Sequence, residues 1–188
     1  MTSLFYIEHA NGKVSDQSLK AITAASQIEG DVHGLIVGSN IDEAVAEASK
    51  INGLSKLLHL DDAAFDNVLA EKLTQVIFNI AGDYDYFLAA ATTTGKNVMP
   101  RLAAKLDVSQ ISEIVAVESA DTFIRTIYAG NAIATVQTSD AKKVLTVRPT
   151  AFKAATTDAA ECEVIKINAE NIPSISEFVG EELTKSDR

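Results

Sequence analysis

Cysteine, proline and long apolar runs are scarce in this 188-residue chain, and tryptophan is absent. A single cysteine, Cys162, excludes an internal disulfide and a cysteine metal cluster, which is typical of a reducing compartment. No apolar run approaches the ~20 residues that a membrane-spanning helix requires. Residues 1–10 also lack the basic segment and apolar core of a signal peptide. We therefore expect neither membrane insertion nor export.

Basic residues are also scarce, because 16 Lys and Arg stand against 26 Asp and Glu, for a net charge of -10. Nucleic-acid binding requires a basic surface that displaces phosphate counterions, so we expect no nucleic-acid partner. At 47% hydrophobic residues the chain can bury a sizeable core. We expect a domain over residues 1–153. Residues 154–188 would form a linker with an edge strand at 161–167 and an amphipathic helix at 174–183.

The segment 87–106 organises the rest of the chain, because it predicts a buried strand, a polar turn and a helix in succession. Its first five residues are apolar without alternation, as in a central strand covered on both faces. The hydroxyls of Thr92, Thr93 and Thr94 can cap the following helix, and Gly95 would allow a tight turn. The helix N-terminus would then lie past the carboxyl end of the strand, where ligands or partners usually meet an open parallel sheet.

Four strand-then-helix units fill residues 1–106. The predicted strands cover 4–7, 32–37, 56–60 and 87–91, and the predicted helices begin near residues 15, 41, 69 and 95. Asn40 and Glu43 predict a capping box for the second helix. Right-handed crossovers between such units specify a parallel sheet with helices on both faces, so the predicted fold class is α/β.

The pattern changes after residue 106. Four strand-like segments, at 110–118, 121–128, 132–138 and 142–148, follow one another with short turns and no helix between them. This pattern predicts antiparallel hairpins added to the parallel core.

No phosphate-binding loop is complete. Around Gly95-Lys96 the P-loop pattern fails twice, because Ala90 stands in place of its first glycine and Asn97 in place of Ser or Thr. A helix N-terminus with a lysine in its first turn can still hold an anion weakly. The candidates for this anion site are Thr94, Gly95 and Lys96. The alternative is a packing or subunit-contact role for Lys96, Asn97 and Arg101.

The sequence supports neither a metal site nor covalent catalysis. His9, His33 and His59 lie on separate strands or strand ends without nearby carboxylate or cysteine partners, so we expect no metal site. No serine has the context of a nucleophile elbow, and Cys162 has no flanking signature of a catalytic thiol. The residue types alone describe an α/β domain without a self-contained active site.

Several motifs are more specific than their composition. They are Ile7-Glu8-His9, Leu60-Asp61-Asp62, Gly95-Lys96-Asn97, Pro100-Arg101-Leu102-Ala103-Ala104, Gln110-Ile111-Ser112-Glu113-Ile114, the run TFIRTIYAGNA at 122–132, and Val147-Arg148-Pro149-Thr150-Ala151-Phe152. With these motifs the chain closely resembles the amino-terminal domain of the alpha subunit of electron transfer flavoprotein, a heterodimeric flavin carrier. The resemblance covers essentially the whole sequence.

The resemblance implies a Rossmann-like parallel sheet of the adenine nucleotide alpha hydrolase type, with helices on both faces and an antiparallel hairpin extension. It implies that FAD is held by a second domain beyond Arg188, so no residue here is assigned to FAD and the natural polypeptide is expected to continue. The beta subunit would hold AMP. Through FAD, the whole protein would carry electrons from acyl-CoA and other dehydrogenases to a membrane quinone oxidoreductase.

For this chain the resemblance implies a non-catalytic scaffold that pairs with the beta subunit. Our candidates for the heterodimer contact are Phe123, Arg125, Tyr128 and Asn131, since aromatic residues and arginine are favoured in interface cores. The alternative for Phe123 and Tyr128 is packing within the domain's own core.

An alternative function is an AMP- or ATP-binding domain that uses the 92–96 turn and the 8–12 loop. Titration of the chain with these nucleotides would separate it from the scaffold. The lack of a basic presequence before the first strand favours bacterial cytoplasm over mitochondrial matrix.

Overall fold

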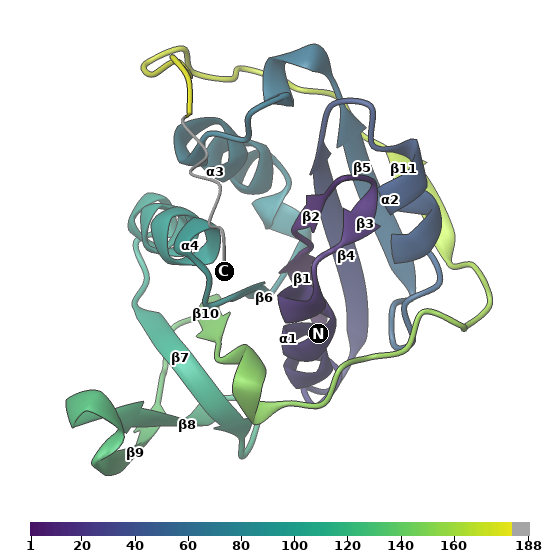
Figure 1. Cartoon of the computed structure of the whole chain (residues 1–188). Coiled ribbons are helices and arrows are strands. Elements are labelled where there is room, and N and C mark those ends of the chain that lie inside the picture. Colours follow the sequence, from purple (N-terminus) through teal and green to yellow (C-terminus); the bar gives the residue numbers. More distant parts are fainter. Residues whose placement is uncertain (182–188) are drawn as a thin grey trace, which may run out of the picture.

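A nine-stranded sheet with helices on both faces forms the molecule (Figure 1). The structure is a computed structural model, and it describes residues 1–181. The strands of the main sheet are β1 (Thr2–Tyr6), β4 (Asp31–Gly38), β5 (Lys56–Asp61), β6 (Tyr86–Ala90), β7 (Gln110–Val117), β8 (Thr122–Ile127), β9 (Ala132–Gln137), β10 (Lys143–Val147) and β11 (Glu163–Lys166). Their order in space is β11-β5-β4-β1-β6-β10-β7-β8-β9. A separate two-stranded hairpin joins β2 (His9–Ala10) to β3 (Lys13–Val14).

The helices are α1 (Asp16–Ala25), α2 (Asp42–Ala48), α3 (Ala70–Asn79) and α4 (Thr93–Leu106). Short 3-10 turns lie at Ala63–Phe65, Ala81–Asp83, Tyr128–Gly130 and Pro149–Ala151. The four predicted strand-then-helix units are therefore confirmed, and their strands β1, β4, β5 and β6 pair in parallel. Within residues 1–181, no helix is long and apolar enough to cross a bilayer.

The side chains of each central strand pack into two separate hydrophobic cores, one on each face of the sheet. In β6, Leu88 and Ala90 belong to the core that includes α1 and α2, whereas Phe87 and Ala89 belong to the core that includes α3 and α4. Both cores consist of nearly inaccessible side chains. Because strands covered on both faces need apolar residues at every position, the unbroken apolar run of β6 is explained, and the predicted placement of helices on both faces is confirmed.

The sequence prediction was only partly right for the strands after α4. The β8–β9 pair is an antiparallel hairpin, as predicted, and β8 is antiparallel to β7. However, β10 is not part of a hairpin, because it enters the sheet between β6 and β7 and is parallel to both. Four of its five residues are buried, so it needs partners on both edges and cover on both faces. The β8–β9 hairpin thus lies within the connection between two parallel strands.

The segment after residue 153 contains one confirmed element and one that is wrong. The predicted edge strand is β11, which pairs in parallel with β5 at the edge of the sheet opposite β9. The predicted helix at 174–183 is absent over residues 174–181, and Leu183 lies outside the described residues. Ser176 Oγ instead donates to Glu71 Oε2 of α3 at 3.2 Å. Tertiary contacts of this kind outweigh the weak tendency of a short isolated segment to form a helix.

Helix α2 is not capped by the predicted Asn40–Glu43 box, since its N-terminus shows no capping side chain from its own segment. The carboxylate of Asp61, at the end of β5, accepts hydrogen bonds from the backbone N–H groups of Asn40 (2.8 Å) and Ile41 (3.4 Å). An acid from the neighbouring strand therefore satisfies backbone donors next to this helix.

Helix α4 begins with the predicted hydroxyl cap, because Thr92 Oγ1 accepts a hydrogen bond from the N–H of Gly95 at 3.0 Å. The expected reason for the glycine was wrong. Gly95 lies within the first turn of α4, and a Cβ atom on it would sit 2.0 Å from the carbonyl oxygen of Ala90. The glycine is needed because α4 packs directly against the end of β6, and not because the chain makes a tight turn.

We predict that Gly95→Ala destabilises the protein by about 3 kcal/mol or more, because the clash is with backbone, which cannot move like a flexible side chain. The intrinsic helix preference of alanine over glycine, about 1 kcal/mol, would offset only part of this cost. Urea unfolding of both proteins measures the difference. Gly82→Ala is the matched control, because a Cβ there meets nothing within 4 Å. Equal stability of the Gly95 variant and the wild type would contradict this account of the α4–β6 contact.

Candidate functional site

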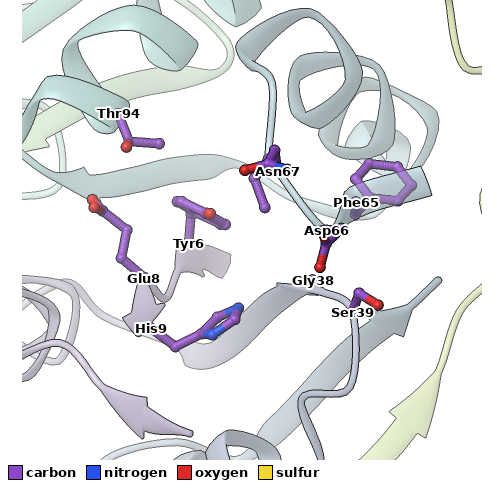
Figure 2. Close-up of a pocket in the computed structure, with 10 residues that line it drawn as sticks. Tyr6, Glu8, His9, Gly38, Ser39, Phe65, Asp66, Asn67 and Thr94 are labelled. Carbon is purple, nitrogen blue, oxygen red and sulfur yellow. The ribbon is translucent and has the colours of Figure 1, made fainter. Parts of the chain in front are cut away.

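A pocket lies where β1, β4 and α4 meet, at the carboxyl edge of the parallel strands (Figure 2). Its lining residues are Tyr6, Glu8, His9, Gly38, Ser39, Phe65, Asp66, Asn67, Val68 and Thr94. Its volume is about 260 Å³, just below the range of roughly 300–1,000 Å³ that is usual for small-molecule sites. This is the position at which open parallel sheets bind ligands, so its chemistry decides whether a nucleotide suits it.

A carboxylate stands at the N-terminus of α4. Glu8 Oε1 accepts a hydrogen bond from Thr92 Oγ1 at 2.5 Å, and the same hydroxyl caps the N–H of Gly95. Partial burial raises the pKa of Glu8, and the hydrogen bond from Thr92 offsets part of that rise. Because anions are favoured at helix N-termini, Glu8 already supplies the negative charge that a bound phosphate would bring.

The opposite wall of the pocket is polar and has a second acid, Asp66. Figure 2 shows the His9 ring beside Gly38, and His9 Nε2 lies 3.0 Å from the carbonyl oxygen of Val37. A Cβ on Gly38 would approach His9 Nε2 to 2.8 Å, so the glycine makes room for the ring. The pocket therefore combines two carboxylates with a histidine that contacts backbone.

The three candidates for an anion site do not converge on this pocket. Thr94 lines it, while the N–H of Gly95 is engaged by Thr92. Lys96 is absent from the lining, and its Nζ pairs with Glu113 Oε1 of β7 at 2.5 Å. Since the only nearby lysine of the motif is directed elsewhere and Glu8 faces the helix N-terminus, the geometry is electrostatically unfavourable for phosphate.

A second, larger cavity of about 580 Å³ lies beside the β8–β9 hairpin. It is lined by Ser112, Glu113, Arg125, Thr126, Ile127, Tyr128, Ala129, Gly130 and Arg148. Residues from β7, β8, the turn before β9 and the end of β10 thus meet here, although they are far apart in sequence. We call this the hairpin cavity.

Glu113 reaches the hairpin cavity from an irregular position of β7. Its φ is +53°, and the pairing of β7 with β10 shifts register there. Its N–H donates to Thr146 Oγ1 at 2.9 Å. The hydrogen bond from Lys96 lowers the pKa of Glu113, and the charges of Lys96, Arg148 and Arg125 lower it further. The bulge therefore places one ionised acid among three cations.

The four candidate contact residues differ in their surroundings. Phe123 is fully buried in the α1–α2 core, so the alternative of core packing holds for it. Tyr128 is 79% exposed and does not pack in the core. Asn131 is exposed, and its Nδ2 donates to the carbonyl oxygen of Tyr128 at 2.9 Å. Arg125 is half-buried and lines the hairpin cavity.

Three residues of this region have no local sequence signal of a functional role. Glu113 and Arg148 belong to motifs that carry the family resemblance, but only the fold brings them to the same cavity. Ile133, on β9, is 73% exposed. The alternating pattern of β9 was the one signal that could have identified it, because alternate residues of an edge strand with one covered face point to solvent.

The three histidines lie apart, as their strands suggest. His33 Nδ1 lies 3.0 Å from the hydroxyl of Tyr84, and His59 Nδ1 has no hydrogen-bond partner within residues 1–181. Over the same residues, no group of three or more His, Cys, Asp or Glu side chains is placed to hold a metal ion.

The topology and the pocket at the sheet edge define an α/β domain of the Rossmann-like class. Sequence comparison narrows this class, because the model of the electron transfer flavoprotein domain matches residues 3–172. The chain belongs to the electron transfer flavoprotein family.

The most similar curated relatives include alpha subunits of electron transfer flavoprotein. The chain is 47% identical over 188 residues to that of Pseudomonas aeruginosa, covering all of this chain and 61% of the relative. It is 43% identical to that of Paracoccus denitrificans, again over the whole chain and 61% of the relative. A relative from Cryptococcus neoformans, named a probable mitochondrial alpha subunit, is 41% identical, with 56% of its length covered. The chain thus spans about 60% of the length of the bacterial relatives and corresponds to their amino-terminal part.

We predict that Glu8→Gln stabilises the protein at pH 7 and has little effect below about pH 4. Burial raises the pKa of Glu8 above its ordinary value of about 4.3, so the folded chain holds this proton more tightly than the unfolded chain. The ionised acid therefore lowers stability as the pH rises through that ordinary value and up to the raised one. Glutamine retains an oxygen for Thr92 without the charge.

Thermal melts of both proteins across this pH range measure the effect as a difference in Tm. Glu29→Gln, at an exposed glutamate, controls for the loss of one negative charge. The difference in Tm between Glu8→Gln and wild type should grow as the pH rises. If it does not, burial does not destabilise the ionised form of Glu8, and the prediction is wrong.

Proposed function

We propose that this chain is the scaffold and heterodimerisation domain of an electron transfer flavoprotein alpha subunit, and that its partner is the beta subunit. The observation that carries the proposal is the β8–β9 hairpin, which projects from the body of the molecule (Figure 1). Tyr128 and Ile133, both large apolar side chains, are 79% and 73% exposed on it. Two large exposed apolar side chains on one projecting element favour a protein–protein contact there.

The backbone of the hairpin turn supports the same proposal. Tyr128, Ala129 and Gly130 all have positive φ, at +50°, +54° and +93°. For Tyr128 and Ala129 this conformation costs about 1 kcal/mol or more each. Such strain is concentrated at functional positions, and here it holds a tyrosine out in solvent.

In the proposed whole protein, FAD shuttles electrons from acyl-CoA dehydrogenases and other dehydrogenases to a membrane quinone oxidoreductase, and the beta subunit holds AMP. Family membership supports this role. The proposed location is bacterial cytoplasm, with the mitochondrial matrix as the alternative, since one relative is named mitochondrial.

The residues at the sheet edge do not fit FAD or AMP. A dinucleotide pyrophosphate or a nucleotide phosphate would face Glu8 at the N-terminus of α4, and Lys96 is paired with Glu113 instead of the pocket. We therefore propose that FAD is bound by polypeptide outside this chain and that this domain is not catalytic. When bound, the flavin supplies the redox chemistry, and this chain supplies a rigid base for it.

We predict that the purified chain is colourless and shows no flavin band in its visible absorbance spectrum, because its sheet-edge pocket is unsuited to phosphate. The spectrum is recorded before and after incubation with excess FAD and removal of the unbound flavin. A preparation that retains stoichiometric FAD would place the flavin site in this chain and refute the proposal.

We predict that Tyr128→Ala weakens binding of the beta subunit roughly tenfold or more, as truncation of a central aromatic contact does. The Tm of the chain should not change, because this side chain is exposed. Isothermal titration calorimetry with the purified beta subunit measures the affinity. Val164→Ala on β11, at the opposite edge of the sheet, is the control and should bind as the wild type does. Unchanged affinity for the Tyr128 variant would remove the hairpin from the interface.

A further inference from the structure

Two arginines face the hairpin cavity without an acidic partner of their own. The one acid in its lining, Glu113, is paired with Lys96. Among residues 1–181, neither Arg125 nor Arg148 forms an ion pair. The cavity therefore carries net positive charge, although the whole chain has a net charge of -10.

The two arginines differ in how they are held. Arg148 Nη1 donates to Thr126 Oγ1 at 2.9 Å, and the backbone N–H of Arg148 donates to the carbonyl oxygen of Ile114 at 2.9 Å. Arg125 lies on β8, which is paired on both sides by β7 and β9. The Arg148 side chain is thus positioned before any partner arrives, which reduces the entropy lost on binding, whereas strand pairing fixes only the backbone of Arg125.

Arg125 also has an unsatisfied donor. Its Nε is buried and has no hydrogen-bond partner within the described part of the chain. A buried unpaired N–H costs roughly 1–3 kcal/mol, and more when the group is charged, so a shift of the Arg125 side chain that brings this donor to an acceptor of the partner would be favourable. A carboxylate is well suited, since its two oxygens match the parallel N–H groups of a guanidinium.

The surface around the cavity indicates where that carboxylate comes from. Tyr128 forms part of the lining and is largely exposed, and Ile133 is exposed on the neighbouring strand β9. A free anion would leave this apolar surface in water, whereas an acidic side chain on a polypeptide would cover it at the same time.

The geometry points to the hairpin cavity as a socket for an Asp or Glu side chain of the partner subunit, with Arg125 and Arg148 as its ligands and Tyr128 as the adjacent apolar contact. This inference rests on the proposed heterodimer and adds the chemistry by which the partner is recognised. Because one ionic contact sits in a partly enclosed site, it contributes specificity and register as well as affinity.

The first experiment compares the affinity of wild type, Arg125→Gln and Arg148→Gln for the purified beta subunit by calorimetry at low and high salt. Each substitution should weaken binding roughly 30-fold, since loss of one member of a hydrogen-bonded charge pair leaves the other charge unpaired. Lys50→Gln, which removes one positive charge beside Glu161, should change binding less than about twofold. Arg125→Lys should recover only part of the loss, because lysine lacks the planar fork.

The second experiment identifies the acid. Arg125→Lys and Arg148→Lys place an amine in the socket, and a carbodiimide then joins it to any carboxylate in contact. Mass spectrometry should find an amide between the new lysine and an Asp or Glu of the beta subunit. The internal Lys96–Glu113 pair serves as a positive control for the coupling. Arg148→Lys carries this test alone if the half-buried Arg125 position does not tolerate lysine, as judged by Tm.

The experiments distinguish failure of the proposed function from failure of the proposed socket. If wild-type chain does not bind the beta subunit, the proposed function fails and the socket fails with it. If wild type binds and both glutamine variants bind equally well with wild-type Tm, only the socket is refuted. It is also refuted if the new lysines couple only to residues of this chain, or if inorganic phosphate binds saturably through both arginines while binding of the beta subunit does not depend on them.

Discussion

The burial of β6 on both faces is the constraint on which the rest of this structure depends. All five residues of β6 are buried, and they supply both hydrophobic cores in alternation. A strand in that position needs hydrogen-bonded neighbours on each edge, which β1 and β10 provide, and helices on each face. Helix α4 follows directly and packs so closely that residue 95 has no room for a side chain. The carboxyl edge of the sheet and the N-terminus of α4 are thereby fixed.

The charges around this edge are arranged unfavourably for a bound phosphate. The position that would suit a phosphate is taken by Glu8, which is linked through Thr92 to the first turn of α4. Lys96 does not line the pocket, because its Nζ forms an ion pair with Glu113 of β7. Among the described residues, Arg125 and Arg148 form no ion pair, and both line the hairpin cavity. The sheet edge therefore keeps the topology of a nucleotide-binding fold without the positive charge that a phosphate needs.

The connection between β7 and β10 determines where the hairpin cavity lies. Helices α1 to α4 connect the parallel strands from β1 through β7, but between β7 and β10 the β8–β9 hairpin occupies the connection and extends the sheet past its parallel part. Such an extension has little core of its own beyond Phe123, so its turn and outer strand remain exposed. The same route brings Arg148, at the end of β10, beside Thr126 of β8. The hairpin cavity thus exists because the hairpin lies within the connection between β7 and β10.

The sequence by itself determined the alternation of strands and helices up to α4, the two-sided burial of β6, a threonine cap at the start of α4 and the β8–β9 hairpin. These features depend on residues close together along the chain, whose apolar period and turn chemistry are visible locally. Only the tertiary structure decided that β10 enters the parallel sheet, that Asp61 accepts hydrogen bonds at the start of α2, and that residues 174–181 form no helix, with Ser176 bonded to Glu71 of α3. It also decided which charges meet at the hairpin cavity. The physical reason is that strand order and ion pairing depend on the energy of contacts between distant segments, which no local pattern records.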